Sequence, residues 1–248
     1  MSVGEPLVRF NLWVDAVGGY LVCLGDHVTI GQSPAAGRSS PGGGNNSARL
    51  TGATGAGGAT GAGGATGVAG VTGVAGAVGA AGRGPDIEIL APISRHHATL
   101  HRSAEGYVLE PLNPVSRNGK PMREAEGLVD GDELEIGTGV KLRFRQPHPL
   151  SLSAVLEFTS RRQTRSAIDA AVLMADSLVL GPRTHSHIVC RNWRDEAVLF
   201  RRPGGLACRA AGNWRVDGHL ANGPSAIDGN SRVAGEDFSF SIESVAGQ

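Results

Sequence analysis

Short apolar segments separated by turn residues predict β-strands along most of the chain. Near the start, residues 7–14 are apolar with polar interruptions, Gly18 and Gly19 mark a turn, and residues 20–24 form a second apolar segment. Short strands with turn signals about every 8–12 residues are typical of antiparallel β-sandwiches. We therefore expect an all-β protein.

A glycine-rich tract interrupts this pattern. Glycine occupies every third position from residue 52 to residue 82. A Gly-x-y period is the signature of collagen, in which only glycine fits at the axis of the triple helix. The tract contains no proline, however, whereas collagen-like sequences contain roughly 15–20%. We interpret residues 33–85 as a disordered low-complexity insertion. A glycine-rich helical arrangement or a trimerising stalk is the alternative.

The second half of the chain repeats the first. Residues 29–31 align with residues 179–181 once the insertion, residues 34–84, is left out. The further correspondences pair residues 98–102 with 197–201, 118–119 with 217–218, 130–132 with 228–230, and Phe144 with Phe240.

This repeat predicts two β-sandwich domains in tandem. The first occupies residues 5–147 and carries the insertion, and the second occupies residues 153–246. Prolines indicate a linker at residues 147–153. Residues 161–175 also suit a helix, but the repeat favours a loop followed by a strand at residues 171–180.

Two polar turns in the first half carry the candidate chemistry. They consist of Ser94, Arg95, His96 and His97 in one turn, and Ser116, Arg117, Asn118 and Gly119 in the other. Guanidinium, hydroxyl and amide donors hold a phosphate through charge-assisted hydrogen bonds, which are about twice as strong as neutral ones. Neither turn supplies an activated nucleophile or a set of metal ligands. The turns therefore predict a binding module.

The spacing of these turns resembles that of the forkhead-associated (FHA) domain, which reads phosphothreonine peptides. Residues 27–31 resemble the strand before the family's Gly-Arg pair, residues 128–137 resemble its Gly-Asp hairpin, and residues 141–145 resemble its closing strand. The resemblance covers residues 7–146 apart from the insertion. It implies a β-sandwich whose partner is a phosphorylated protein.

The resemblance also implies a role for each residue of the site. The phosphopeptide-binding set is Gln32, Ser94, Arg95, Ser116, Arg117 and Asn118. The structural set is Gly31, His97 and Gly119. Asn118 would hold the backbone of the peptide, and the serines would bind the phosphate and its loop.

One position departs from the family. Its phosphate-binding arginine follows the glycine of the strand, and here Gln32 follows Gly31. Arg95, Arg117 or an arginine of the insertion are the candidates to compensate. Alternatively, the polar residues only shape turns, since Ser and Asn often bond to nearby backbone.

The second copy has lost the site by this alignment. Trp193, Asp195 and Glu196 stand where the first copy has Ser94, His96 and His97. Because two acidic residues repel phosphate, we interpret the second copy as a degenerate FHA-like sandwich.

Composition narrows the function further. The formal net charge is zero, so no overall field favours nucleic acid or an anionic membrane. Three widely spaced cysteines argue against a disulfide framework, and no segment reaches the ~18 apolar residues of a membrane helix. We expect a cytoplasmic protein without metal or cofactor. Histidines and cysteines between residues 185 and 208 lack zinc-site spacing.

The sequence thus favours a phosphothreonine-peptide reader in kinase-dependent signalling. The alternative is a structural or assembly protein whose FHA-like domains no longer bind phosphate. An enzyme is not expected, because no set of nucleophile and base is visible. The sequence does not indicate an oligomeric state.

Overall fold

The computed structural model describes residues 8–33, 84–148, 151–160, 164 and 168–245. Every helix or strand assigned in these residues is a β-strand, so the expectation of an all-β protein is confirmed. No helix in these ranges is long and apolar enough to cross a membrane. Residues 34–83 of the predicted insertion lie outside the described residues.

In the described residues of the first half of the chain there are eleven strands. They are β1 (Arg9–Val14), β2 (Gly18–Cys23), β3 (His27–Gln32), β4 (Ile87–Ile89), β5 (Ala98–Ser103), β6 (Gly106–Pro111), β7 (Val115–Arg117), β8 (Lys120–Met122), β9 (Glu126–Leu128), β10 (Glu133–Ile136) and β11 (Val140–Arg145). The first two strands match the two apolar segments seen in the sequence, but the turn between them lies at residues 15–17, and Gly18 and Gly19, expected to form it, begin β2.

Eleven further strands follow in the second half. They are β12 (Ala154–Phe158), β13 (Ala170–Leu173), β14 (Ser177–Gly181), β15 (Ile188–Val189), β16 (Ala197–Arg202), β17 (Gly205–Ala210), β18 (Arg215–Val216), β19 (His219–Leu220), β20 (Ser225–Ile227), β21 (Arg232–Ala234) and β22 (Ser239–Ser244). The single strand expected at residues 171–180 is in fact the two strands β13 and β14, because the chain passes between sheets at residues 174–176.

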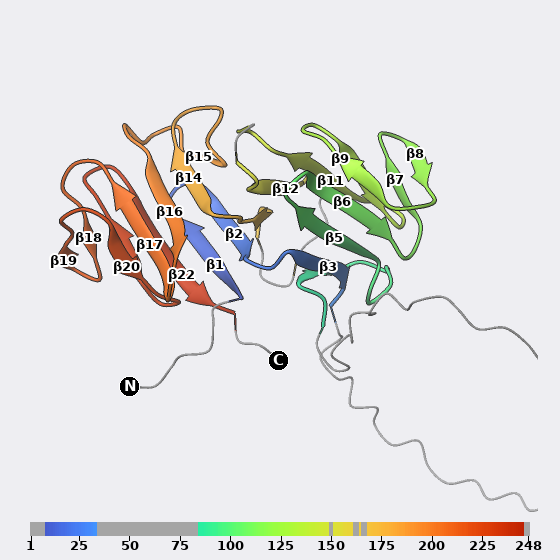
Figure 1. Cartoon of the computed structure of the whole chain (residues 1–248), viewed down its shortest axis with the longest axis horizontal. Coiled ribbons are helices and arrows are strands. Elements are labelled where there is room, and N and C mark those ends of the chain that lie inside the picture. Colours follow the sequence, from blue (N-terminus) through green and yellow to red (C-terminus); the bar gives the residue numbers. More distant parts are fainter. Residues whose placement is uncertain (1–7, 34–83, 149–150, 161–163, 165–167, 246–248) are drawn as a thin grey trace, which may run out of the picture. The chain divides into compact units, whose positions relative to one another are not determined.

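Twelve strands form one continuous sheet in the order β19-β18-β21-β22-β1-β2-β13-β12-β11-β10-β7-β8. The other strands form two five-stranded sheets, β4-β3-β5-β6-β9 and β15-β14-β16-β17-β20. In the long sheet β1 pairs with β22, and β12 pairs with β11. Figure 1 shows the blue β1 beside the red β22.

This pairing does not follow the two ranges expected from the sequence, 5–147 and 153–246. Each half places its first two strands beside the last strand of the other half. That residues 5–147 and 153–246 are separate domains stays a prediction. The order of strands is nevertheless the same in both halves, strand for strand.

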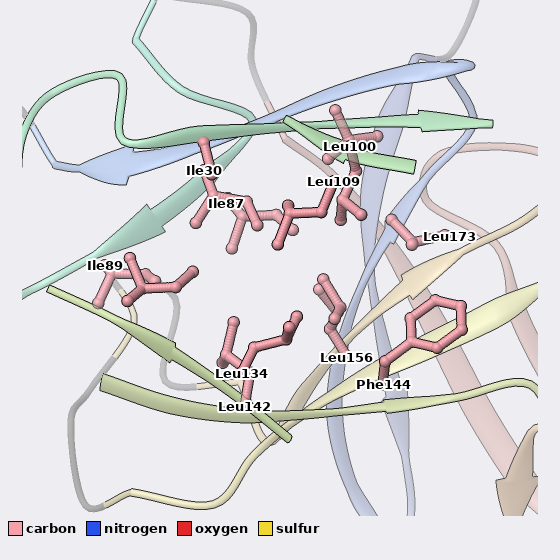
Figure 2. Packing of buried hydrophobic residues seen from close by; sticks show 14 of the residues in the cluster. Ile30, Ile87, Ile89, Leu100, Leu109, Leu134, Leu142, Phe144, Leu156 and Leu173 are labelled. Carbon is pink, nitrogen blue, oxygen red and sulfur yellow. The ribbon is translucent and has the colours of Figure 1, made fainter. Parts of the chain in front are cut away.

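Two hydrophobic cores lie on opposite faces of the long sheet. In β2 and just beyond it, Leu21 and Cys23 belong to the first core, whereas Val22 and Leu24 belong to the second. Successive side chains of a strand point to opposite faces, so each five-stranded sheet covers a different face. Figure 2 shows the first core, with side chains from the two layers facing each other.

The hydrogen bonds fix which residues of the two halves correspond. Phe144 N–H donates to the Asp132 carbonyl, and Ile242 N–H donates to the Ser231 carbonyl. Phe144 therefore corresponds to Ile242 and not, as expected, to Phe240. The cause is the register of the two hairpins: Glu133 pairs with Arg143, ten residues later, whereas its counterpart Arg232 pairs with Ser241, nine residues later.

Candidate functional site

The turn between β4 and β5 packs directly on the end of β3. Gln32 N–H donates to the Ser94 carbonyl at 2.9 Å. A Cβ added to Gly31 would lie 1.8 Å from the Arg95 carbonyl oxygen, far closer than any real Cβ approaches. Only glycine allows this approach of two backbone segments. Gly31 thus sets the position of Ser94 and Arg95 relative to Gln32.

His97 holds this turn against the segment that leads into β7. The residue is 3% exposed, and its Nδ1 accepts a hydrogen bond from Ser94 N–H at 3.3 Å. The ring proton is then on Nε2, which donates to the Pro114 carbonyl at 2.9 Å. The His97 carbonyl accepts from the N–H groups of Leu112 and Asn113, each at 3.0 Å. His97 therefore links the first turn to the segment before β7.

Several predicted binding residues present free polar groups beside this turn. Gln32 and Arg95 are exposed, and Ser94 and Ser116 are half-buried. Within the described part of the chain, the Arg95 guanidinium has no acidic partner and the Ser94 hydroxyl has no hydrogen bond. A cation and a hydroxyl are thus available to an anionic ligand.

Arg117, in contrast, is already paired. Its Nε donates to Asp132 Oδ2 at 2.9 Å and its Nη1 to Glu126 Oε2 at 3.3 Å. Burial would raise the pKa of the Asp132 carboxyl, but hydrogen bonds from Val129 N–H, Arg117 and Asn118 hold that pKa below its ordinary value. The hydrogen bond with Asp132 raises the pKa of Arg117. The Arg117 charge is neutralised inside the fold rather than offered to a ligand.

The Asn118 side chain also makes hydrogen bonds within the fold. Asn118 and Gly119 have φ values of 52° and 76° and form a two-residue turn between β7 and β8. Asn118 Nδ2 donates to Asp132 Oδ1 at 2.7 Å, and its Oδ1 accepts from Glu133 N–H at 2.9 Å. These two bonds use one N–H and one lone pair of the amide. In this structure Asn118 shapes the turn and fastens it to β10.

The second half contains the same turn with the polarity reversed. Asp217 has a φ of 51°, and its carboxylate accepts from Arg232 N–H at 2.7 Å and from the Ser231 hydroxyl at 3.1 Å. In the first half Asn118 donates and Asp132 accepts; in the second Ser231 donates and Asp217 accepts. The turn needs one hydrogen-bond donor and one acceptor. The residue in the turn can be the donor, as Asn118 is, or the acceptor, as Asp217 is.

This reversal makes a testable prediction. We expect Asn118→Asp to lower the free energy of unfolding by about 2–3 kcal/mol, because it removes a charge-assisted bond and sets two carboxylates side by side. Asn118→Asp combined with Asp132→Ser recreates the arrangement of the second half and should recover at least about 1 kcal/mol. Urea denaturation measures both. If the double variant is no more stable than Asn118→Asp alone, the turn does not work as a donor–acceptor pair.

The counterpart of the binding turn in the second half is built differently. Trp193 is 6% exposed and packs on Phe238 with ring centroids 5.1 Å apart. Glu196, which stands at the position of His97, lies 3.7 Å from His185 Nε2 and 3.8 Å from Arg183 Nε. This turn therefore presents a buried indole and a carboxylate where the first half presents Ser94 and His97. No set of three metal-ligating side chains occurs in the described residues of either half.

Sequence reasoning missed Asp132 and Asn113 as residues of the site. Asp132 was recognised only as part of a hairpin turn, and its contacts with Arg117 and Asn118 span 15 and 14 residues. Asn113 Nδ2 donates to the His96 carbonyl at 3.0 Å and joins the first turn to the segment that leads into β7. The spacing between His96 and Asn113 contains no motif that would have indicated this bond.

The fold and these turns define a β-sandwich with polar turns at one edge. Residues 81–137 match the family model of the FHA domain. This segment, which contains both turns, belongs to the FHA domain family, as the sequence resemblance indicated. FHA domains are interaction modules that bind phosphopeptides, and they are not enzymes. No curated protein and no solved structure matches the chain.

Proposed function

We propose that this protein binds phosphothreonine-containing proteins through the first half of the chain and acts in kinase-dependent signalling. The proposal rests on two polar groups of one turn. Among the described residues the Arg95 guanidinium has no acidic partner and the Ser94 hydroxyl has no hydrogen bond, and Gly31 and His97 hold the backbone of this turn in place. Because the backbone of this turn is held in place, only the side chains of Ser94 and Arg95 have to be ordered when a phosphate dianion binds. The membership of residues 81–137 in the FHA family supports the same ligand class.

The proposed contacts are fewer than the sequence suggested. Ser94, Arg95, Ser116 and Gln32 form the ligand-binding set, since their side chains have no acidic partner in the described part of the chain. Arg117 and Asn118 support the site from behind through Asp132. The alternative function, that of a structural or assembly protein, is supported by Gln32, which stands where the family has its phosphate-binding arginine.

Removal of the Ser94 hydroxyl tests the function directly. We expect Ser94→Ala to weaken binding to a degenerate phosphothreonine peptide library by at least about 10-fold, because a lost hydrogen bond to a charged group costs about 1.5–3 kcal/mol. Ser103→Ala, at the far end of β5, is the control and should bind as the parent protein does. If the parent protein retains phosphorylated and unphosphorylated peptides equally, it does not recognise phosphothreonine, and the structural or assembly function is favoured.

Gln32→Arg tests the departure from the family. Gln32 is exposed at the end of β3, next to the Ser94 carbonyl. A guanidinium there adds a charge-assisted bond, so affinity should rise several-fold to about 10-fold, with the entropy of ordering the side chain limiting the gain. The gain should shrink as salt rises, since an exposed charge is screened. Unchanged affinity in a fluorescence-anisotropy titration would mean that Arg95 already supplies the cation.

A further inference from the structure

The first core is completed by strands from the second half of the chain. Leu156 of β12 and Leu173 of β13 are fully buried in the same cluster as Phe144 and Leu109. Figure 2 shows Leu156 and Leu173 among the side chains of this core. β12 pairs with β11 over four residue pairs. The sandwich that carries the Ser94 turn therefore depends on strands that follow it in the sequence.

The second core is completed in the same way by the beginning of the chain. Phe10, Leu12 and Val14 of β1 are buried in it and lie opposite β22, with Leu12 beside Ile242. Leu12 and Leu156 hold equivalent places, because Leu12 lies opposite Ile242, Leu156 lies opposite Phe144, and Phe144 and Ile242 correspond. The two halves have exchanged their first two strands.

The exchange places β2 and β13 side by side in parallel, with Val22 opposite Val172. Both strands contribute alternate side chains to the two cores, so both faces are buried. A strand buried on both faces needs an uninterrupted apolar sequence, and residues 20–24 and 170–175 have one. A strand with one wet face would alternate with polar residues instead. The composition of these two strands thus suits the exchanged arrangement.

The two chain crossings are fastened by equivalent residues. Residues 24–26 lead from β2 into β3, and residues 174–176 lead from β13 into β14. Arg102 of β5 donates to Asp26 Oδ1 at 2.7 Å and 3.1 Å, and Arg201 of β16 donates to the Leu24 carbonyl at 3.0 Å. The N–H groups of Arg102 and Arg201 bond to the carbonyls of Asp26 and Asp176. The backbone of each arginine thus bonds to the crossing of its own half, while the Arg201 side chain bonds to the crossing of the other half.

From this arrangement we propose that the second half acts as the structural complement of the reader. It contributes β12 and β13 to the sandwich that carries the Ser94 turn and receives β1 and β2 in return. The binding site is therefore built by the whole chain and not by residues 5–147 alone. This role explains what a copy without the binding turn does in the protein, and it holds whether or not the first half binds phosphothreonine.

Cysteine crosslinking in the full chain tests the exchange. Glu157 lies opposite Arg143 in the exchanged arrangement, whereas the unexchanged arrangement would place it opposite Ser241. We expect a short bismaleimide to join Glu157→Cys to Arg143→Cys within one molecule, as read by peptide mass spectrometry. The variant with Glu157→Cys and Ser241→Cys should not crosslink, since β12 and β22 are four strand spacings or about 19 Å apart. The opposite pattern would overturn the proposal, and a crosslinked dimer would place the exchange between molecules and overturn it too.

Hydrogen exchange tests the consequence independently of ligand binding. Leu156→Ala opens space in the first core, so we expect it to lower amide protection in β5 and β6 by at least 10-fold. Leu12→Ala is the matched variant in the second core and should lower protection in β16 and β17 to a similar degree. If Leu156→Ala leaves β5 and β6 unchanged and affects β16 and β17 alone, the second half does not complete the reader.

Discussion

Gly31→Ala should abolish measurable phosphopeptide binding and lower the free energy of unfolding by about 1–3 kcal/mol. The new methyl group would lie 1.8 Å from the Arg95 carbonyl oxygen, 2.5 Å from the carbonyl carbon and 3.1 Å from the Ser94 oxygen. All three are backbone atoms, so no side-chain rotation relieves the clash. The turn must move away from β3. That movement strains the bond between Gln32 N–H and the Ser94 carbonyl and displaces the two groups that would hold the phosphate.

The control for this substitution is Gly127→Ala. Gly127 is also in a strand, but an added Cβ there would meet only the Tyr107 carbonyl oxygen at 3.9 Å, which is ordinary contact. The entropy that alanine removes from the unfolded chain is the same in both variants. The difference between the two variants in peptide titration and urea denaturation therefore measures the clash of the added Cβ at residue 31, without the entropy effect. Phosphopeptide affinity that survives in Gly31→Ala would show that the Ser94 turn does not bind the ligand.

Protonation of His187 should lower the free energy of unfolding of the protein in mild acid. His187 is 2% exposed, its Nδ1 accepts from Val179 N–H at 3.0 Å, and its Nε2 lies 3.2 Å from the Ser151 hydroxyl. Burial, followed by the proximity of His148 and Arg145, lowers the pKa of His187 from 6.5 to about 4. A proton on Nδ1 would also break the bond to Val179. The folded protein therefore keeps this ring neutral.

The sign of the pH dependence follows from that lowered pKa. Above pH 6.5 the ring is neutral in both states, and its contribution to stability is fully present. As the pH falls from 6.5 towards 4, the unfolded chain binds a proton that the folded chain refuses, and stability is lost. The difference between 6.5 and about 4 corresponds to about 3 kcal/mol.

Comparison of variants isolates this group from the carboxylates that titrate in the same range. The stability advantage of the parent protein over His187→Gln should shrink by about 3 kcal/mol between pH 7.5 and pH 4. His219→Gln, which changes an exposed histidine of β19, should run parallel to the parent protein. Parallel profiles for all three proteins in chemical denaturation would show that His187 is not held neutral by the fold.

Local sequence determined the strands and turns of this protein. The apolar segments at residues 7–14 and 20–24 predicted β1 and β2, and the Asn118-Gly119 pair forms a two-residue turn in which both residues have positive φ. The two polar turns indicated the candidate site, and residues 81–137, which contain them, match the family model of the FHA domain. These features depend on interactions between near neighbours, which the sequence states directly.

The partners of these elements depended on the tertiary structure. Asn118 and Arg117 carry the right groups for a ligand, but Asp132 lies within reach only after β10 folds beside β7, and it binds both. β1 and β12 present equivalent faces, with Leu12 and Leu156 in equivalent places, so the pattern of either strand suits either sandwich. A strand's hydrophobic pattern specifies which face is buried but not which edge it joins. That choice is visible only in the long-range pairing of β1 with β22 and of β12 with β11, which no local motif records.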